Sequence, residues 1–208
     1  MCILFFHAKK LNLHGKFRVI IVSNRDEFYA RPAQPAHFWR EHCDVFGGRD
    51  QQAGDEGGTW LAINKQGRLA TLLNITSALR ETTARSRGHL VTDFVTSQVP
   101  GPQFQAQVVQ EALQHNPFHL LTMEIVPDDV RVLYVARQPD GQVLGPEELS
   151  PSLDTPLTAS LSNSPLHIPF RKAKEGAQIF QDLIARLDNT DRKEELISSL
   201  LAFAKTNT

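Results

Sequence analysis

Short apolar runs, rather than one long periodic pattern, dominate the first third of the chain. Residues 2–7 (CILFFH) and 17–23 (FRVIIVS) are rich in β-branched and aromatic side chains. The polar segment 9–16 between them contains Asn12 and Gly15, so the two runs predict a β-hairpin. Further strands are predicted at 45–48, 59–64 and 68–75. The segments 25–44 and 50–58 hold prolines or several glycines and are predicted as loops.

From residue 88 onward the apolar spacing changes to that of a helix. The stripe at positions 90, 91, 94 and 95 predicts a helix over 88–97, which Pro100-Gly101-Pro102 is expected to end. A second helix is then expected to reach about residue 116 and to pack beside the first. The remaining pattern predicts strands at 118–126, 130–137 and 157–161, followed by helices at 173–187 and 196–203.

This order of elements favours an α+β fold. Blocks of strands and blocks of helices without strict alternation indicate antiparallel-rich sheets. The glycines at 47–48, 54 and 57–58 match neither the dinucleotide-binding nor the phosphate-binding loop pattern. A chain of 208 residues buries roughly 70% of its extended surface on folding, so it needs no disulfides. We predict a single domain over residues 1–208.

Charge and cysteine content narrow the class of protein. The 22 lysines and arginines are balanced by 23 aspartates and glutamates, for a net charge of -1, which disfavours nucleic-acid binding. No apolar run approaches the ~18–20 residues of a membrane span, and residues 3–6 are too short for a signal peptide. Cys2 and Cys43 allow at most one bridge. The sequence therefore predicts a cytoplasmic protein that is not transmembrane.

The residues that most often hold metals do not form a recognisable set. His37, His42 and Cys43 are close together, but their i, i+5, i+6 spacing matches no zinc signature. The eight histidines offer no defined pair of haem ligands. We predict no metal and no cofactor. Trp39 and Trp60 lie beside glycine-rich loops and are expected to fill a core more readily than to line a pocket.

Cys2 is the residue with the clearest chemical potential. A small residue after the initiator methionine normally becomes the new amino terminus, so the mature chain would begin with cysteine. An α-amine beside a thiol is the pairing that activates amino-terminal nucleophiles, because one residue then supplies both the base and the nucleophile. The alternative is a cysteine that merely begins an edge strand.

The segment Asn24-Arg25-Asp26-Glu27 follows the second predicted strand directly. The hairpin would return it to the end of the strand pair that carries Cys2. A guanidinium there would favour the thiolate, and a carboxylate could hold the amine. If the extended conformation continues, Arg25 and Glu27 share one face and Asn24 and Asp26 the other. The alternative is an ordinary polar strand end with an ion pair and a turn.

These residues belong to a longer series that resembles a known family. The series begins with Cys2 before an apolar strand and continues with NRDEFYARP at 24–32 and GGTWL at 57–61. Asn74, SRG at 86–88, NPFHLL at 116–121 and LSN at 161–163 complete it. In this order the motifs resemble the transport and Golgi organisation protein 2 family, which is also called the NRDE-motif family.

The resemblance implies both a fold and a site. The family is similar to cysteine N-terminal-nucleophile hydrolases, which have an αββα sandwich. By resemblance the catalytic candidates are Cys2 as nucleophile, Arg25 and Asp26 as its charged neighbours, and Asn74 and Asn163 as amide donors to an oxyanion. The candidate substrate-binding residues are Asn24, Glu27 and Trp60.

The resemblance also implies a cellular role in Golgi organisation, secretion and haem mobilisation, with a location near the Golgi or mitochondria and haem or another small molecule as cargo. Two alternatives stay open: an active cysteine amidohydrolase that uses Cys2, and a protein-interaction module without a ligand. The chain departs from the family pattern at His119, where Asn is expected, and at Phe170, where Trp is expected. It is also expected to lack the last strands of the fold, which would leave a sheet edge unpaired and prone to aggregation.

Overall fold

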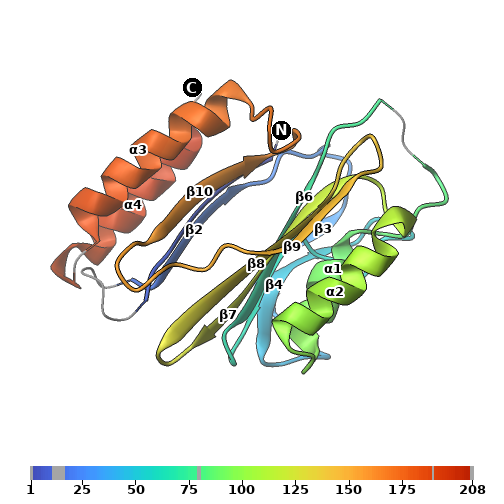
Figure 1. Ribbon diagram of the computed structural model, residues 1–208, viewed down its shortest axis with the longest axis horizontal. Helices are drawn as coiled ribbons and strands as arrows, with labels where there is room; N and C mark the ends of the chain where they lie inside the picture. The colour runs from blue at the N-terminus through green and yellow to red at the C-terminus, as the bar shows by residue number, and fades with distance from the viewer. Residues whose placement is uncertain (1, 11–16, 79–80, 189, 207–208) are drawn as a thin grey trace. The chain divides into compact units, whose positions relative to one another are not determined.

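The computed structural model describes residues 2–10, 17–78, 81–188 and 190–206, and these residues divide into two compact units. Unit 1 comprises Met1–Asp26 with Ser150–Thr208, and unit 2 comprises Glu27–Leu149. The ribbon in Figure 1 carries the element labels used below. The connection predicted for residues 9–16 lies largely outside the described residues. Each unit consists of a sheet with helices on one face.

Unit 1 is built on a three-stranded antiparallel sheet in the order β10-β1-β2. Figure 1 shows α3 and α4 side by side along these strands. The elements are β1 (Ile3–Ala8), β2 (Val19–Asn24), β10 (Leu157–Ser162), α3 (Arg171–Leu187), a 3₁₀ turn at Thr190–Arg192, and α4 (Lys193–Lys205).

The core of unit 1 lies between this sheet and its two helices. Alternate residues of a strand face opposite sides of the sheet, and Phe5 on β1 faces the helices. Its ring centroid is 5.7 Å from that of Phe180 on α3 and 4.8 Å from that of Phe203 on α4. A Cβ at Gly176 would lie 2.6 Å from the Phe5 ring. Glycine at this position therefore allows α3 to approach β1 closely.

Two buried polar residues lie at the far end of β1. Lys9 forms an ion pair with Asp188, and both side chains are almost fully buried. His7 donates or accepts a hydrogen bond with Thr158 Oγ1 at 2.8 Å, and its Nε2 is buried without a hydrogen-bond partner among the described residues. Burial lowers the pKa of His7, and the Lys9 ammonium lowers it further. Protonating this imidazole therefore opposes folding.

The lowered pKa of His7 predicts a stability that depends on pH. The unfolded chain protonates this histidine at a higher pH than the folded one does, so the free energy of unfolding should fall as the pH drops below about 6.5. One proton accounts for at most about 1.4 kcal/mol per pH unit. Urea unfolding at pH 7.5 and 5.5 should show a smaller loss for His7→Gln than for the wild type. The exposed His167 is the control; a loss in His7→Gln equal to that in His167→Gln would contradict this assignment.

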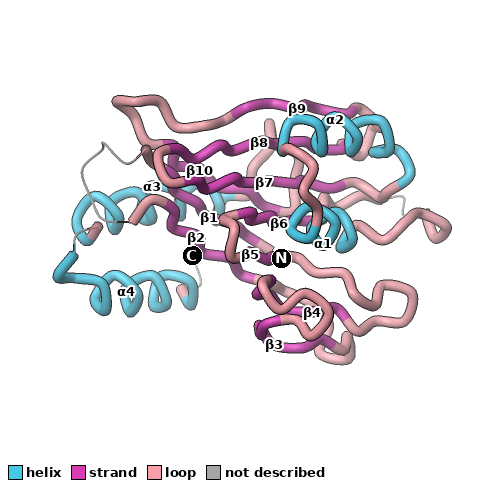
Figure 2. Tube along the Cα trace, turned by 90° about the horizontal axis from the view of Figure 1, so that it is seen from below, coloured by secondary structure: helices cyan, strands magenta, loops and turns pink. Residues whose placement is uncertain are grey.

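Unit 2 is built on a seven-stranded antiparallel sheet in the order β3-β4-β5-β6-β7-β8-β9. In Figure 2 its two helices lie over one face of this sheet; α1 packs on β5 and β6, and α2 on β8 and β9. The strands are β3 (Ala33–Phe38), β4 (Val45–Asp50), β5 (Leu61–Asn64), β6 (Arg68–Asn74), β7 (Phe118–Val126), β8 (Asp129–Arg137) and β9 (Val143–Glu148), and the helices are α1 (Gly88–Thr96), α2 (Gly101–Glu111) and a 3₁₀ turn at Ala112–Gln114.

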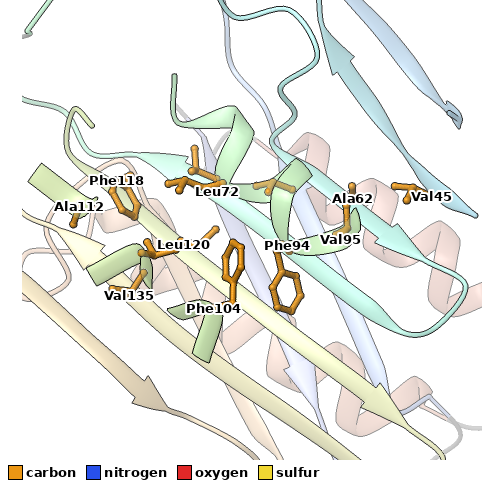
Figure 3. Close-up of a cluster of buried hydrophobic side chains, with 14 of the residues drawn as sticks. Val45, Ala62, Leu72, Phe94, Val95, Phe104, Ala112, Phe118, Leu120 and Val135 are labelled. Atoms are coloured by element: carbon orange, nitrogen blue, oxygen red, sulfur yellow. The ribbon is translucent and has the colours of Figure 1, made fainter. Parts of the chain in front are cut away.

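The core of unit 2 fills the space between this sheet and α1 and α2. Figure 3 shows Phe94 of α1, Phe104 of α2 and Leu120 of β7 in one cluster of buried side chains, and the two rings meet edge to face with centroids 5.2 Å apart. Trp39 and Val135 belong to the same buried cluster. The cluster confirms the expected side-by-side helices and the expected role of Trp39 as a core residue.

Arg68 forms several hydrogen bonds at the border of this core. Its guanidinium donates to Glu124 Oε1 at 2.8 Å and to the carbonyl oxygens of Phe94 and Val99 at 3.1 and 2.7 Å. Those carbonyls belong to the last part of α1 and to the segment that follows it, where helical hydrogen-bond donors run out. The guanidinium carbon also lies 4.0 Å from the centroid of the Phe94 ring. Arg68 therefore ties the end of α1 to the sheet.

We expect Arg68→Met to lower the free energy of unfolding by about 3–5 kcal/mol, because it leaves the Glu124 carboxylate without its buried partner. Arg131 faces the same carboxylate at 3.8 Å but is 44% exposed, so Arg131→Met should cost less than about 1 kcal/mol. Chemical denaturation of both variants measures the difference. Equal losses would show that burial does not set the strength of this interaction.

Most predicted elements are confirmed to within two or three residues, but one segment was predicted wrongly and one strand was missed. The segment 25–44, predicted as a loop, contains β3, and β9 was not predicted at all. The helix predicted over 88–97 does end before Pro100-Gly101-Pro102, and the second predicted helix, α2, begins at Gly101. Proline fits the first turn of a helix, where its missing N–H would have no partner.

Candidate functional site

The pairing of β1 with both its neighbours determines what lies around Cys2. Ile3 is opposite Asn24 on β2 and opposite Ser162 on β10. Both neighbours run antiparallel to β1, so the residue before Ile3 meets the residues that follow Asn24 and Ser162. This register confirms that the hairpin returns the NRDE segment to Cys2.

The Cys2 sulfur lies against the backbone of Asp26. The Asp26 N–H donates to Sγ at 3.4 Å, and Sγ lies 3.6 Å from the Asp26 carbonyl oxygen. The carbonyl can accept the thiol proton, and the N–H can stabilise negative charge on sulfur. Cys2 is half-buried and forms no disulfide. The thiol therefore has a defined position and a donor suited to its thiolate form.

The Cys2 nitrogen has its own partner. It donates a hydrogen bond to Oδ1 of Asn163, the residue that follows β10. The sulfur and the nitrogen of one residue are thus held by two different segments, one after β2 and one after β10. If Met1 is removed, this nitrogen becomes the α-amine, and Asn163 then orients the general base.

A cavity of about 260 Å³ opens in unit 1; Asp26 lines it, whereas Cys2 and Asn163 do not. Arg25, Lys172 and Lys205 line it and carry positive charge, while Asp26 is its one acidic lining residue. The cavity lies where the start of α3 meets the end of α4. Its other lining residues are Ile3, Phe5, Asn24, Gly176, Phe203, Ala204 and Thr206.

Asn24 connects the strand end to the helical layer. Its side-chain nitrogen donates to the carbonyl oxygen of Ala204 at 2.6 Å, near the end of α4. The extended conformation ends at Asn24, so the expected alternation of Arg25 and Glu27 against Asn24 and Asp26 does not occur. Asn24, Arg25 and Asp26 instead line the same cavity, because the chain leaves the sheet there.

Three of the predicted site residues belong to unit 2. Glu27 accepts a hydrogen bond from the N–H of Phe28 at 3.1 Å and lies 3.8 Å from the Arg31 guanidinium. Asn74 is the exposed last residue of β6, opposite Phe118. Trp60 is half-buried, and its ring lies against Gly48. Their roles stay predictions.

His119, one of the departures from the family pattern, is a buried residue of β7. Its Nδ1 is hydrogen-bonded to the Tyr134 hydroxyl at 2.7 Å, and the two rings stack. Burial raises the pKa of Tyr134, so the phenol stays neutral. This hydrogen bond lies inside unit 2.

A second hollow lies in unit 2, at the β3 edge of its sheet. This groove of about 850 Å³, called the Trp39 groove below, is lined by Gln34, Pro35, Ala36, His37, Trp39, Arg40, Glu41, Arg49, Asp50, Gln51, Glu56 and Gly57. Sequence reasoning did not find it, because Trp39 lay in a segment predicted as a loop. Within the described parts of the chain, no three His, Cys, Asp or Glu side chains cluster as metal ligands would.

Comparison with solved structures places the fold in a known class. The chain resembles the Caenorhabditis elegans ortholog of N-acylethanolamine-hydrolyzing acid amidase with a TM-score of 0.50 and 11% identity, over 98% of this chain and 86% of that one. That enzyme has the N-terminal-nucleophile hydrolase fold. The predicted fold class, α+β with antiparallel sheets of this type, is therefore confirmed.

The chain belongs to the Transport and Golgi organisation 2 family, whose model matches residues 1–208. It is 37% identical to the human Transport and Golgi organization protein 2 homolog over 205 residues, which is 97% of this chain and 70% of that protein. Against the Drosophila melanogaster Transport and Golgi organization protein 2 the identity is 30% over 199 residues, covering 88% and 65% of the two chains. In the described part of the chain, no helix has the length and apolar character to cross a membrane.

Proposed function

We propose that this protein acts in the transport and Golgi organisation processes for which its family is named, and that it does so with a working amide-directed nucleophile at Cys2. One observation carries the proposal. The sulfur of Cys2 is held by the backbone of Asp26 while its nitrogen is held by Asn163. A cysteine that merely began a strand would need neither contact, whereas an amino-terminal nucleophile needs both of its reacting atoms in fixed positions.

The reaction that this arrangement supports is amide cleavage. After removal of Met1, the α-amine accepts the thiol proton and sulfur bonds to the carbonyl carbon of the amide. The ammonium then returns the proton to the leaving nitrogen as the C–N bond breaks, which leaves a thioester on Cys2. Water cleaves the thioester, releases a carboxylic acid and restores the thiol. Asn163 is the candidate side-chain donor to the oxyanion, and the Asp26 N–H stabilises the attacking thiolate.

The cavity beside this site indicates the class of substrate. Arg25, Lys172 and Lys205 give its lining an excess of positive charge, and Ile3, Phe5 and Phe203 give it an apolar wall. Ile3 and Asp26 both line the cavity and adjoin Cys2, by a peptide bond and by the sulfur contact. We infer that the substrate is a small amide with an apolar portion and an anionic group.

An electrophilic amide probe that labels cysteine tests the role of Cys2. We expect Cys2→Ala to abolish labelling and to lower any amidase turnover by at least about 10³-fold, because the nucleophile is lost. Cys43 is the matched control, since it is exposed and free; Cys43→Ala should retain the labelling. Equal labelling of wild type and Cys2→Ala would eliminate the hydrolase and leave a carrier or interaction role.

Haem mobilisation is a second candidate, and His37 in the Trp39 groove is the observation that favours it. The Nδ1 of His37 lies 2.8 Å from the Pro35 carbonyl oxygen. A carbonyl only accepts, so Nδ1 carries the proton and Nε2 presents a lone pair, as in most metal-binding histidines. The groove volume of about 850 Å³ falls in the range of small-molecule sites. His37 would then be the axial ligand of a haem cargo.

Titration with haem, followed by the Soret band, tests the carrier role. We expect the wild type and His42→Gln to shift the band alike and His37→Gln to lose most of the shift, because His37 lines the groove with its Nδ1 proton held by a carbonyl, whereas His42 does not line it. No shift in the wild type, or equal shifts in both variants, would rule out His37 as a haem ligand. Neither result bears on Cys2.

A further inference from the structure

The Trp39 groove contains a guanidinium whose hydrogen-bonding capacity is only partly used. Arg49 on β4 is 16% exposed, and its guanidinium carbon lies 4.1 Å from the centroid of the Trp39 ring. Trp39 is itself fixed in the core, because its Nε1 donates to the Gly47 carbonyl oxygen at 3.0 Å. The flat stacking partner sets the plane of the guanidinium, so Arg49 is a rigid donor at the wall of the groove.

The Glu41 carboxylate, which Arg49 contacts, does not use all of the hydrogen-bond donors of the guanidinium. Nη2 of Arg49 lies 2.6 Å from Oε1 of Glu41, whereas Nη1 is buried and has no hydrogen-bond partner among the described residues. A guanidinium binds a carboxylate best through two parallel N–H donors, and a buried N–H without an acceptor is destabilising. Glu41 is 51% exposed. The Glu41 carboxylate is therefore half exposed to water and contacts Arg49 through a single nitrogen, Nη2.

The opposite wall of the groove is held in place independently of Glu41. The Arg31 guanidinium contacts Asp50 and Asp55 at 2.7 and 2.8 Å, across the loop that follows β4. Thr92 of α1 donates to the carbonyl oxygen of Gly57 at 3.0 Å. A Cβ at Gly57 would lie 3.2 Å from Arg49 Nη2, so glycine there keeps the loop close to the guanidinium. The site is largely preformed, and Glu41 is its most exposed ion-paired residue.

We propose that the Trp39 groove binds the carboxylate of a small organic molecule, with Arg49 as its anchor and Glu41 as an internal occupant that the ligand displaces. The incoming carboxylate accepts from both Nη1 and Nη2, and Glu41 returns to water. Asp50 and Glu56 also line the groove. Their negative charge disfavours a phosphate dianion relative to a singly charged carboxylate. This site lies in unit 2 and goes beyond the function proposed for Cys2.

Fluorescence of Trp39 reports on the site directly, because Arg49 stacks on its ring. The chain has two tryptophans, so Trp60→Phe leaves Trp39 as the single emitter. Butyrate and inorganic phosphate are titrated separately into this background at constant ionic strength. We expect saturable butyrate binding that is stronger than phosphate binding.

Three variants in the same background separate the anchor from its competitor. Arg49→Met should abolish saturable binding. Glu41→Gln should lower the Kd for butyrate by about 1.4- to 5-fold, since an exposed ion pair of this kind is worth about 0.2–1 kcal/mol. Glu111→Gln removes a similarly exposed carboxylate, 53% exposed and paired with Arg85, and should leave the Kd unchanged.

The proposal is overturned if neither the parent nor Glu41→Gln binds butyrate saturably, or if Glu41→Gln binds no more tightly than Glu111→Gln. The second comparison decides the matter even if Arg49→Met fails to fold, because Glu41 is exposed. Phosphate binding tighter than butyrate would overturn the assignment to carboxylates. Cys2→Ala should bind butyrate as the parent does, so failure at the Cys2 site and failure at this groove are distinguishable.

Discussion

The central position of β1 in its sheet constrains everything else about the site. A strand at the edge of a sheet has one neighbour, whereas β1 has β2 on one side and β10 on the other. Both pairings are antiparallel and both include Ile3. The residue before Ile3 is therefore enclosed by the segments that leave two strands, and it meets Asp26 from one and Asn163 from the other. No long side chain has to reach across the unit to form these contacts.

The two helices of unit 1 add positively charged residues to the cavity beside this strand end. Because α3 and α4 are consecutive helices that cover the same sheet, the start of one lies beside the end of the other. Lys172 and Lys205, far apart in the sequence, thereby reach the same cavity as Arg25. The Asn24 bond to Ala204 links the strand end to the end of α4. The same packing that buries Phe5 also brings these cations to the cavity that Ile3 and Asp26 line.

The sequence predicted the central strands and all four helices, because their apolar periods are strong and their side chains are buried. It missed β3 and β9, the two edge strands of the unit 2 sheet. Each contains a proline, Pro35 or Pro146, which an edge strand tolerates because one of its sides needs no N–H donors. The proximity of Cys2 to the NRDE segment followed from hairpin geometry. The place of Lys172 in the lining of the cavity could not be predicted in this way, since a lysine at the start of a helix usually indicates only a solvated surface.

The chemical state of the Cys2 nitrogen determines whether Cys2 can act as an amino-terminal nucleophile or only begins a strand. With Met1 attached, this nitrogen is an amide that can still donate to Asn163 but cannot accept a proton from the thiol. With Met1 removed, it is an amine beside a held sulfur. The intact mass of the purified protein distinguishes these states directly. We expect a mass lower than that of the full sequence by one methionine residue, and a retained Met1 would contradict the proposed amide chemistry.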